Sequence, residues 1–153
     1  MTIDDIIDYV TGLGGVLHLR PDSGGEWPEI SWGDSFFYYA PDGVVPTTTQ
    51  PFATIVTKDY PDDRSSRLDR PGTFRLNIAA GRENFIEWTG HAPGRGPDEA
   101  DSSITDTVIA HPVYGSAGWL AVVDPGERTD AVVHDLLRTA HDRARTRFER
   151  PTR

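Results

Sequence analysis

Polar side chains with the chemistry to hold a charged ligand occur in two strand-like segments of this sequence. Lys58 and Asp59 follow a β-branched segment, and Arg75 and Asn77 alternate with apolar residues in the segment 73–79. An ammonium can anchor an anion or, once desolvated, act as a base, and a guanidinium beside an amide can hold a carboxylate or phosphate. We expect these four residues to form a ligand-binding site if the segments are neighbouring strands. The simpler alternatives are an ion pair in solvent, worth at most about 1 kcal/mol, and a strand face that meets water.

Acid–base catalysis would require other groups near Lys58, and Asp34 and His111 are the candidates. Asp34 follows Gly33 in an expected two-residue hairpin turn between segments 29–32 and 35–39. Aspartate in a turn commonly bonds its own main chain, and a lone histidine in a turn is more often structural than a general base. Both roles stay open for each residue, so these three are weak catalytic candidates.

Other catalytic and metal-binding motifs are missing from the sequence. It has no cysteine, and its five histidines show no His-x-His or His-x-x-x-His spacing, so we expect no metal site. The serines lack a Gly-x-Ser-x-Gly context, and Gly12, Gly14 and Gly15 follow a helical segment instead of joining a strand to a helix. We therefore expect no cofactor.

Composition limits the class of protein further. The 153 residues carry a formal net charge of −9. They are 37% hydrophobic and 25% charged, a composition typical of a globular protein, and the length predicts a single domain over residues 1–150. An acidic chain is a poor partner for nucleic acid and for anionic lipid. Two acids near the N-terminus argue against a signal peptide, and no apolar run reaches membrane-spanning length. We expect a cytoplasmic protein.

Periodicity predicts the elements that must position these side chains. Thr2 and Asp5 fit a capping box for a helix that ends at Gly14. The final helix would reach Arg150 and bury Phe148 with the apolar residues before it. A short helix is expected over 82–89. The expected strands are 16–20, 29–32, 35–39, 52–58, 73–79 and 119–123, with 107–110 ambiguous between strand and helix end.

Two resemblances follow from local segments. The run 114–122, Tyr-Gly-Ser-Ala-Gly-Trp-Leu-Ala-Val, with the long helix after it, resembles the YjbR/MmcQ-like proteins of the secretion-chaperone-like or CyaY-like group. Over its full length the chain is similar to a family of uncharacterised actinobacterial proteins, through segments 32–39, 52–61, 74–78 and 111–115. Neither family implies an established reaction. YjbR-like proteins are often labelled DNA-binding, which the acidic charge of this chain disfavours.

The expected fold is therefore α+β, with two layers: a twisted, mostly antiparallel sheet covered on one face by the N- and C-terminal helices, as in YjbR-like proteins. The leading functional hypothesis is a non-enzymatic binding or accessory module. Its ligand, a small anion or a protein segment, would meet the open sheet face, and a homodimer is plausible. The alternatives are a small-metabolite enzyme that uses Asp34, Lys58 and His111, and a DNA-binding protein.

Overall fold

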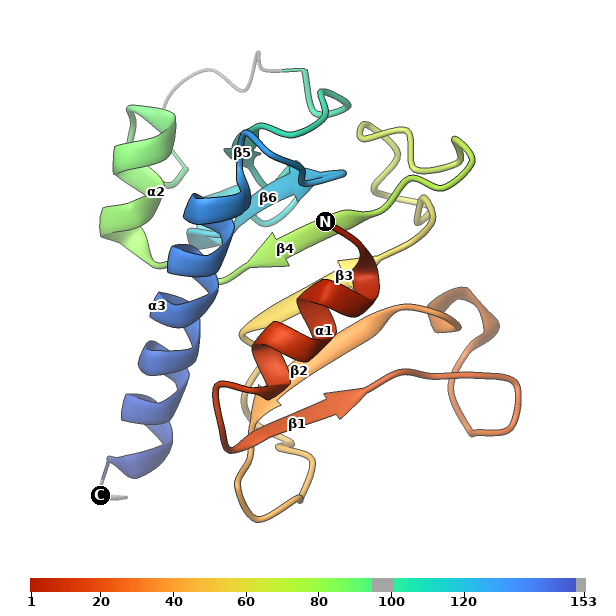
Figure 1. Ribbon diagram of the computed structural model, residues 1–153, viewed down its shortest axis with the longest axis vertical. Coiled ribbons are helices and arrows are strands. Elements are labelled where there is room, and N and C mark those ends of the chain that lie inside the picture. The colour runs from red at the N-terminus through yellow and green to blue at the C-terminus, as the bar shows by residue number, and fades with distance from the viewer. Residues whose placement is uncertain (95–100, 151–153) are drawn as a thin grey trace.

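The computed structural model of the chain describes residues 1–94 and 101–150 (Figure 1). It is an α+β structure, as the sequence predicts. The elements, in chain order, are α1 (Ile3–Thr11), β1 (Val16–Leu19), η1 (Glu29–Ser31), β2 (Ser35–Tyr39), β3 (Ala53–Val56), β4 (Arg75–Ile78), α2 (Arg82–Thr89), β5 (Val108–Ala110), η2 (Gly115–Ala117), β6 (Leu120–Val123) and α3 (Asp130–Glu149), where η marks a short 3₁₀ helix.

The six strands of the described chain form one sheet in the order β1-β2-β3-β4-β6-β5, and every neighbouring pair is antiparallel. One cross-strand row runs from Phe36 to Thr54, Asn77 and Ala121. Two residues further along, on the same face of the sheet, Val56 pairs with Arg75. Strands β3 and β4 are therefore neighbours, which was the condition for the predicted polar site.

Helix α1 begins as the sequence predicts, but it ends at Thr11, before the expected Gly14. The Thr2 hydroxyl accepts a hydrogen bond from the Asp5 amide, and the Asp5 carboxylate accepts one from the Thr2 amide. The chain then passes Gly15, whose φ of 67° favours glycine. A Cβ at this position would lie 2.7 Å from the Tyr39 ring, so glycine lets β1 approach β2.

The predicted hairpin between segments 29–32 and 35–39 is wrong. Residues Glu29–Ser31 form η1, and β2 pairs with β1 and β3 instead. Pro28 precedes this turn, and its carbonyl accepts hydrogen bonds from both the amide and the hydroxyl of Ser31. The Trp32 amide donates to the Glu29 carbonyl. These local bonds take backbone groups that a strand would need for its ladder.

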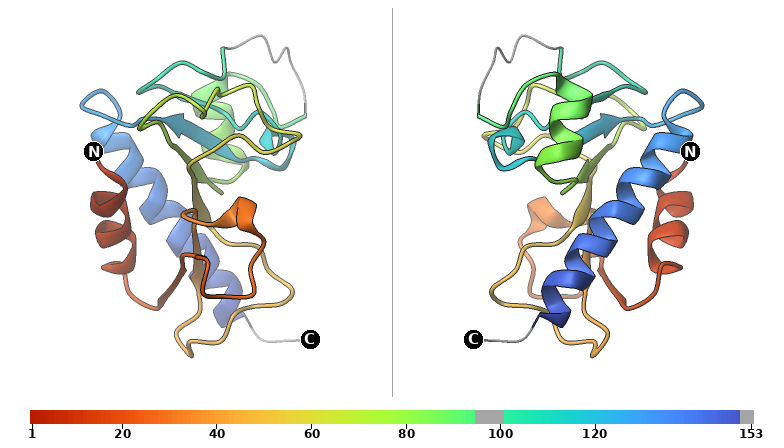
Figure 2. Two further views of the ribbon diagram at one scale, coloured as in Figure 1. Left: turned by 90° about the vertical axis from the view of Figure 1, so that its right-hand side faces the viewer. Right: turned by 90° about the vertical axis from the view of Figure 1, so that its left-hand side faces the viewer.

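The main core lies between the sheet and helices α1 and α3, which are on the same side of the sheet (Figure 2). Alternate strand residues such as Phe37, Ile55 and Leu76 are buried with Ile6 and Leu137 from the helices. The apolar face of α3 ends earlier than predicted. Phe148 is 50% exposed, because the last turns of α3 extend past the edge of the core.

The opposite face of the sheet is covered by loops and is not open to water. The segment around η1 lies on this side (Figure 2), and the 57–73 loop packs its Leu68 against Val56 and Val123. Arg75 and Asn77 are consequently only 1% and 3% exposed. The expectation that these two side chains meet water or an open face is wrong, because loops bury them.

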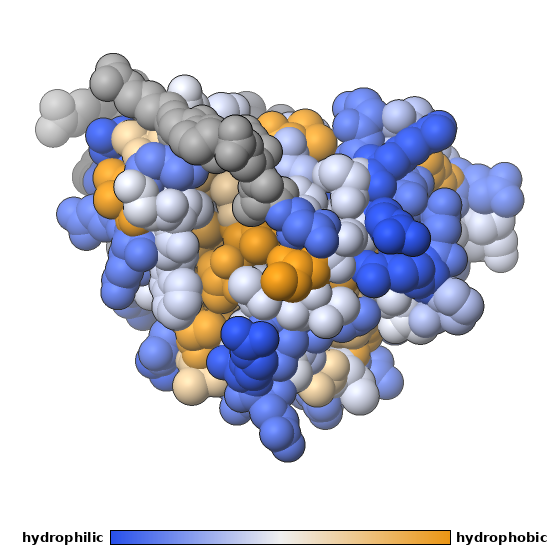
Figure 3. Space-filling model, turned by 90° about the horizontal axis from the view of Figure 1, so that it is seen from above, coloured by the Kyte–Doolittle hydropathy of each residue, from blue (hydrophilic) through white to orange (hydrophobic). Residues whose placement is uncertain are grey.

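The surface is mostly hydrophilic, with separate hydrophobic patches visible on the upper side (Figure 3). Exposed large apolar side chains include Val44, Tyr114 and Phe148. In residues 1–94 and 101–150, no helix has the length and apolar character needed to cross a membrane.

Candidate functional site

The polar groups beneath the loops centre on Arg75, in the middle of the sheet. Its Nε donates to Asn77 Oδ1 at 2.7 Å, and its Nη1 donates to Asp63 Oδ1 and Ser66 Oγ, both at 3.0 Å. Its Nη2 donates to Asp63 Oδ2 at 2.5 Å and faces His111 Nε2 at 3.1 Å. A guanidinium has five N–H groups in a fixed fork, so each one of Arg75 points at a side chain of the protein.

Asp63 is the counter-ion of Arg75 and comes from the 57–73 loop. It binds the guanidinium through both carboxylate oxygens, the bidentate geometry that gives the strongest charge-assisted hydrogen bonds. Burial of Asp63 by itself raises the pKa of its carboxyl group. The hydrogen bonds and the positive charge of Arg75 outweigh burial, so the pKa of Asp63 is lowered overall. The carboxylate is therefore ionised at neutral pH and balances the charge of Arg75.

The same guanidinium fixes the orientation of Asn77. Because Arg75 Nε can only donate, the amide oxygen of Asn77 must face it, and the amide nitrogen then faces β3. Asn77 Nδ2 donates to Thr54 Oγ1 at 2.9 Å. The Thr54 hydroxyl accepts this bond and has its own proton left to donate.

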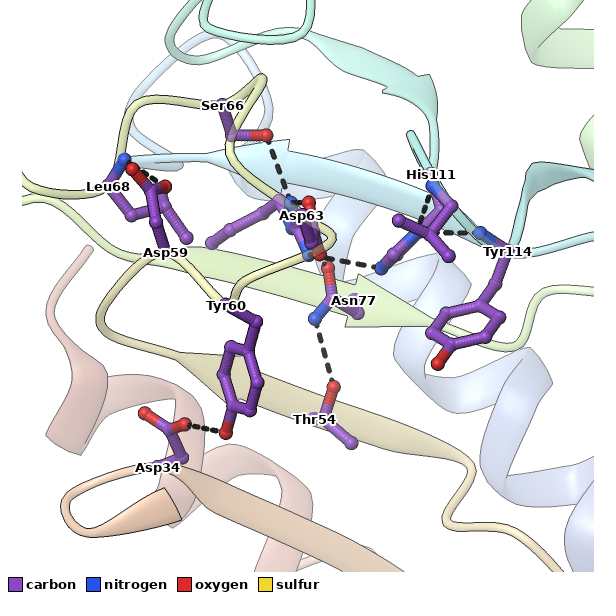
Figure 4. Close-up of polar contacts among 12 residues, drawn as sticks. Asp34, Thr54, Asp59, Tyr60, Asp63, Ser66, Leu68, Asn77, His111 and Tyr114 are labelled. Atoms are coloured by element: carbon purple, nitrogen blue, oxygen red, sulfur yellow. Dashed lines mark hydrogen bonds and ion pairs between the residues drawn. The ribbon is translucent and has the colours of Figure 1, made fainter. Parts of the chain in front are cut away.

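His111 closes the network from the turn after β5. Its Nδ1 accepts hydrogen bonds from the amides of Val113 and Tyr114, at 3.0 and 2.9 Å. Its Nε2 faces Arg75. Figure 4 shows the contact between His111 and Tyr114. Burial and the positive charge of Arg75 lower the pKa of His111 to about 3, although Asp63 opposes that shift. The ring is therefore neutral at physiological pH.

A second cluster surrounds Asp34, at the beginning of β2. Asp34 Oδ1 accepts from the Thr57 amide, the Thr57 hydroxyl and Lys58 Nζ, at 2.9, 2.7 and 3.0 Å. Lys58 Nζ also donates to the Trp32 carbonyl at 2.8 Å. Tyr60 donates to Asp34 Oδ2 at 2.5 Å. Burial, together with the hydrogen bond and charge of Asp34, raises the pKa of the Tyr60 hydroxyl well above its usual value, so this group stays a donor.

A cavity of about 300 Å³ lies over the Arg75 network. Thr54, Asn77, Arg75 and His111 form its polar floor. Most of its wall is aromatic or aliphatic, and Gln50, Asp62 and Asp63 contribute further polar groups. The apolar lining residues are Phe36, Pro51, Val56, Tyr60, Val113, Tyr114 and Trp119.

Only some of the predicted site residues meet at this cavity. Arg75, Asn77 and His111 do. Lys58 and Asp34 are bound to each other and reach the cavity only through Tyr60, which contacts Asp34 and lines the wall. Asp59 accepts a hydrogen bond from the Leu68 amide within its own loop, at 2.9 Å. The predicted group of four is thus divided between a cavity floor and a separate ion pair.

The sequence interpretation did not identify Asp63, Ser66, Tyr60, Thr54 or Trp119 as parts of the site. Thr54 could have been found from strand alternation. It lies on the face of β3 opposite to that of Ile55, and it pairs with Asn77 across the sheet. The residue spacing in segment 59–72 does not indicate which of its aspartates faces the sheet. Trp119 immediately precedes a strand and resembles an ordinary core residue there.

The fold and site together define a small α+β domain with a covered polar cavity on one sheet face. The chain belongs to a family of unknown function, DUF6194, whose model matches residues 1–153. Neither a curated protein nor a solved structure was found to match this chain.

Proposed function

We propose that this protein is a small-molecule binding module, whose ligand is a planar and largely uncharged compound held in the cavity over Arg75. The observation that carries the proposal is the combination of aromatic walls with a hydrogen-bonding floor. Small-molecule sites are typically concave and mostly apolar, with a few convergent polar groups, and span roughly 300–1,000 Å³. The cavity, at about 300 Å³, is at the small end of that range.

Charge balance favours an uncharged ligand over the small anion suggested by the sequence. Arg75 is neutralised by Asp63, and Lys58 by Asp34. Asp62 also lines the cavity and is exposed, with no cation bound to it among the hydrogen bonds and ion pairs of the described residues. An anion would therefore approach a site with more carboxylates than free cations, at an electrostatic cost.

The geometry also favours binding over acid–base catalysis by Asp34, Lys58 and His111. Asp34 is fully buried and accepts four hydrogen bonds, so neither of its oxygens is available to a substrate. His111 Nδ1 already accepts two backbone amides. A general base needs a free lone pair within reach of the substrate proton, and neither residue offers one.

Other parts of the sequence interpretation are kept as proposals. These are the single domain over 1–150, the cytoplasmic location and the homodimer. The hydrophobic patches of Figure 3 support the homodimer, because they could be buried between two copies of the chain. A protein segment as ligand is less favoured than a small molecule, because loops cover the sheet face. The remote YjbR-like relationship is supported by the match at 114–122 and by the long helix α3 that follows.

A charge series of single-ring compounds tests the proposal. Benzamide, benzoate and benzylamine share a ring and differ in charge, and each can be titrated while the melting temperature and ligand NMR signals are followed. We expect benzamide to bind more tightly than benzoate. Trp119→Ala removes part of the cavity wall and should weaken binding. Trp88→Ala, at an exposed position outside the cavity lining, is the matched control and should not. Absence of ring binding, or equal binding by both variants, would contradict the proposal.

A further inference from the structure

The two ring nitrogens of His111 have conflicting hydrogen-bond partners. Its Nδ1 accepts from two backbone amides, those of Val113 and Tyr114. A ring nitrogen that accepts hydrogen bonds carries no proton, so a neutral imidazole must carry its single proton on Nε2. The tautomer is thus set by the turn that contains His111.

The Nε2 proton then faces another donor. Arg75 Nη2 lies 3.1 Å from His111 Nε2, and a guanidinium has donors only. In the other tautomer, the proton on Nδ1 would face two amide donors. That arrangement is less favourable than the present one, in which the Nε2 proton faces one donor of Arg75. His111 is 4% exposed and Arg75 1%, so both side chains are buried and little of either meets water. A buried donor without an acceptor is unfavourable, because it has lost its hydrogen bond to water.

Both groups line the same cavity, and its floor offers further donors. Thr54 Oγ1 accepts from Asn77 and retains its own proton, and Asn77 Nδ2 has a second N–H beyond the one given to Thr54. The other N–H groups of Arg75 are taken by Asn77, Asp63 and Ser66. The floor is therefore rich in donors and needs acceptors from whatever occupies the cavity.

We propose that the ligand of this cavity is an uncharged planar ring bearing a carbonyl oxygen, and that this oxygen accepts hydrogen bonds from His111 Nε2 and Arg75 Nη2. The inference rests on the proposed binding function and specifies the ligand class of the same site. A carbonyl supplies the missing acceptor without adding charge next to Asp63. The ring lies among the aromatic walls, where stacked and edge-to-face contacts are favourable. Thr54 and Asn77 provide donors for a second acceptor on the same ring.

Two single-ring probes separate acceptor recognition from simple ring binding. N-methyl-2-pyridone has a carbonyl acceptor and no N–H donor, whereas N-methylaniline has a donor and no carbonyl. We expect the pyridone to bind the wild-type protein roughly tenfold more tightly, as one well-placed hydrogen bond implies. His111→Asn retains a side-chain oxygen in the place of Nδ1, for the amides of Val113 and Tyr114, and lacks Nε2. This variant should lose the preference for the pyridone and keep its weak affinity for the aniline.

A measurement on the wild-type protein keeps the inference testable if His111→Asn does not fold. Long-range ¹H–¹⁵N NMR reports which ring nitrogen of His111 is protonated. We expect the Nε2–H tautomer, with a shift of that signal when the pyridone is added and none with the aniline. An Nδ1–H tautomer would overturn the inference, and so would equal affinities of the two probes while the cavity still binds rings. Failure of both probes to bind would instead remove the proposed function, and the inference with it.

Discussion

The Tyr60 hydroxyl donates a 2.5 Å hydrogen bond to Asp34 Oδ2, and this bond joins the 57–73 loop to the beginning of β2. Three residues after Tyr60, the same loop contains Asp63, which binds Arg75. Tyr60 also lines the cavity. The loop is thus attached to the sheet at two buried ionic centres, with one wall of the cavity between them.

Replacing Tyr60 by Phe is expected to destabilise the fold by about 1–3 kcal/mol, because a fully buried carboxylate oxygen loses its donor. Urea unfolding at neutral pH measures this change. Tyr38→Phe is the matched control, since the Tyr38 hydroxyl has no hydrogen bond to any residue in the described chain; we expect a change within about 0.5 kcal/mol. Equal effects of the two substitutions would show that the bond to Asp34 contributes nothing.

Arg75→Lys is expected to destabilise the protein by about 3–5 kcal/mol, although the charge is kept. A lysine ammonium cannot bind Asp63 through two parallel N–H groups and reach Asn77 and Ser66 as well, and a buried pair that loses its geometry leaves a poorly compensated charge. Arg64→Lys, at an exposed position of the same loop, should change stability by less than about 0.5 kcal/mol. A loss below about 1 kcal/mol for Arg75→Lys would mean that the network is not needed for folding.

Stability is expected to fall as the pH is lowered from 6.5 towards 4.5. The pKa of His111 is about 3 in the folded protein and about 6.5 when unfolded, so in this range the unfolded chain binds one more proton at this residue. The resulting slope is up to about 1.4 kcal/mol per pH unit. Urea unfolding across this range should show a shallower slope for His111→Asn than for the wild type. His18 and the carboxylates are present in both proteins and largely cancel in the difference, so parallel profiles would contradict the assignment.

Leu137→Ala should destabilise the protein by about 2–5 kcal/mol, because the side chain is 1% exposed in the core between α3 and the sheet. Phe148→Ala lies on the same helix at a 50% exposed position and should cost less than about 1 kcal/mol. Thermal and urea unfolding of the two variants test the difference. Similar losses for both would mean that the last turns of α3 are held more tightly than their exposure indicates.

No binding to duplex DNA is expected at near-physiological salt, because the net charge is −9. Fluorescence anisotropy with a labelled duplex, repeated at several salt concentrations, measures this directly. Micromolar binding that weakens as the salt concentration rises would contradict the prediction. It would also favour the DNA-binding alternative suggested by the YjbR-like resemblance.

Local patterns predicted elements well wherever local forces determine them. The capping box at Thr2 and Asp5, and the β-branched segment that became β3, needed no knowledge of distant residues. Segment 29–32 was misassigned, because its apolar pattern resembles a strand while its backbone bonds close a turn after Pro28. The alternation in segment 73–79 correctly placed Phe74, Leu76 and Ile78 on the core face of the strand. Arg75 and Asn77 lie on the other face, at the cavity.

The site itself was only partly predictable, because its contacts join distant parts of the sequence. Asp63 and His111 lie 12 and 36 residues from Arg75 and reach it through loop and turn geometry. Polar alternation normally indicates a face in contact with water, so nothing in the pattern indicates that loops bury Arg75 and Asn77. Lys58 and Asp34 were named together as candidates for acid–base catalysis, and they form an ion pair at 3.0 Å, but the sequence left open whether Asp34 was only a turn residue.

The position of β6 between β4 and β5 has a consequence for synthesis on the ribosome. β6 is the last strand to be made, and it is the only neighbour of β5 in the described sheet, so β5 cannot join the sheet before β6. The meander β1-β2-β3-β4 can pair as it emerges, but its apolar face waits for the 20 residues of α3. A nascent chain arrested before α3 therefore exposes a wide apolar surface, the kind of surface that chaperones bind. The main core on this face of the sheet therefore closes only after α3 has been made.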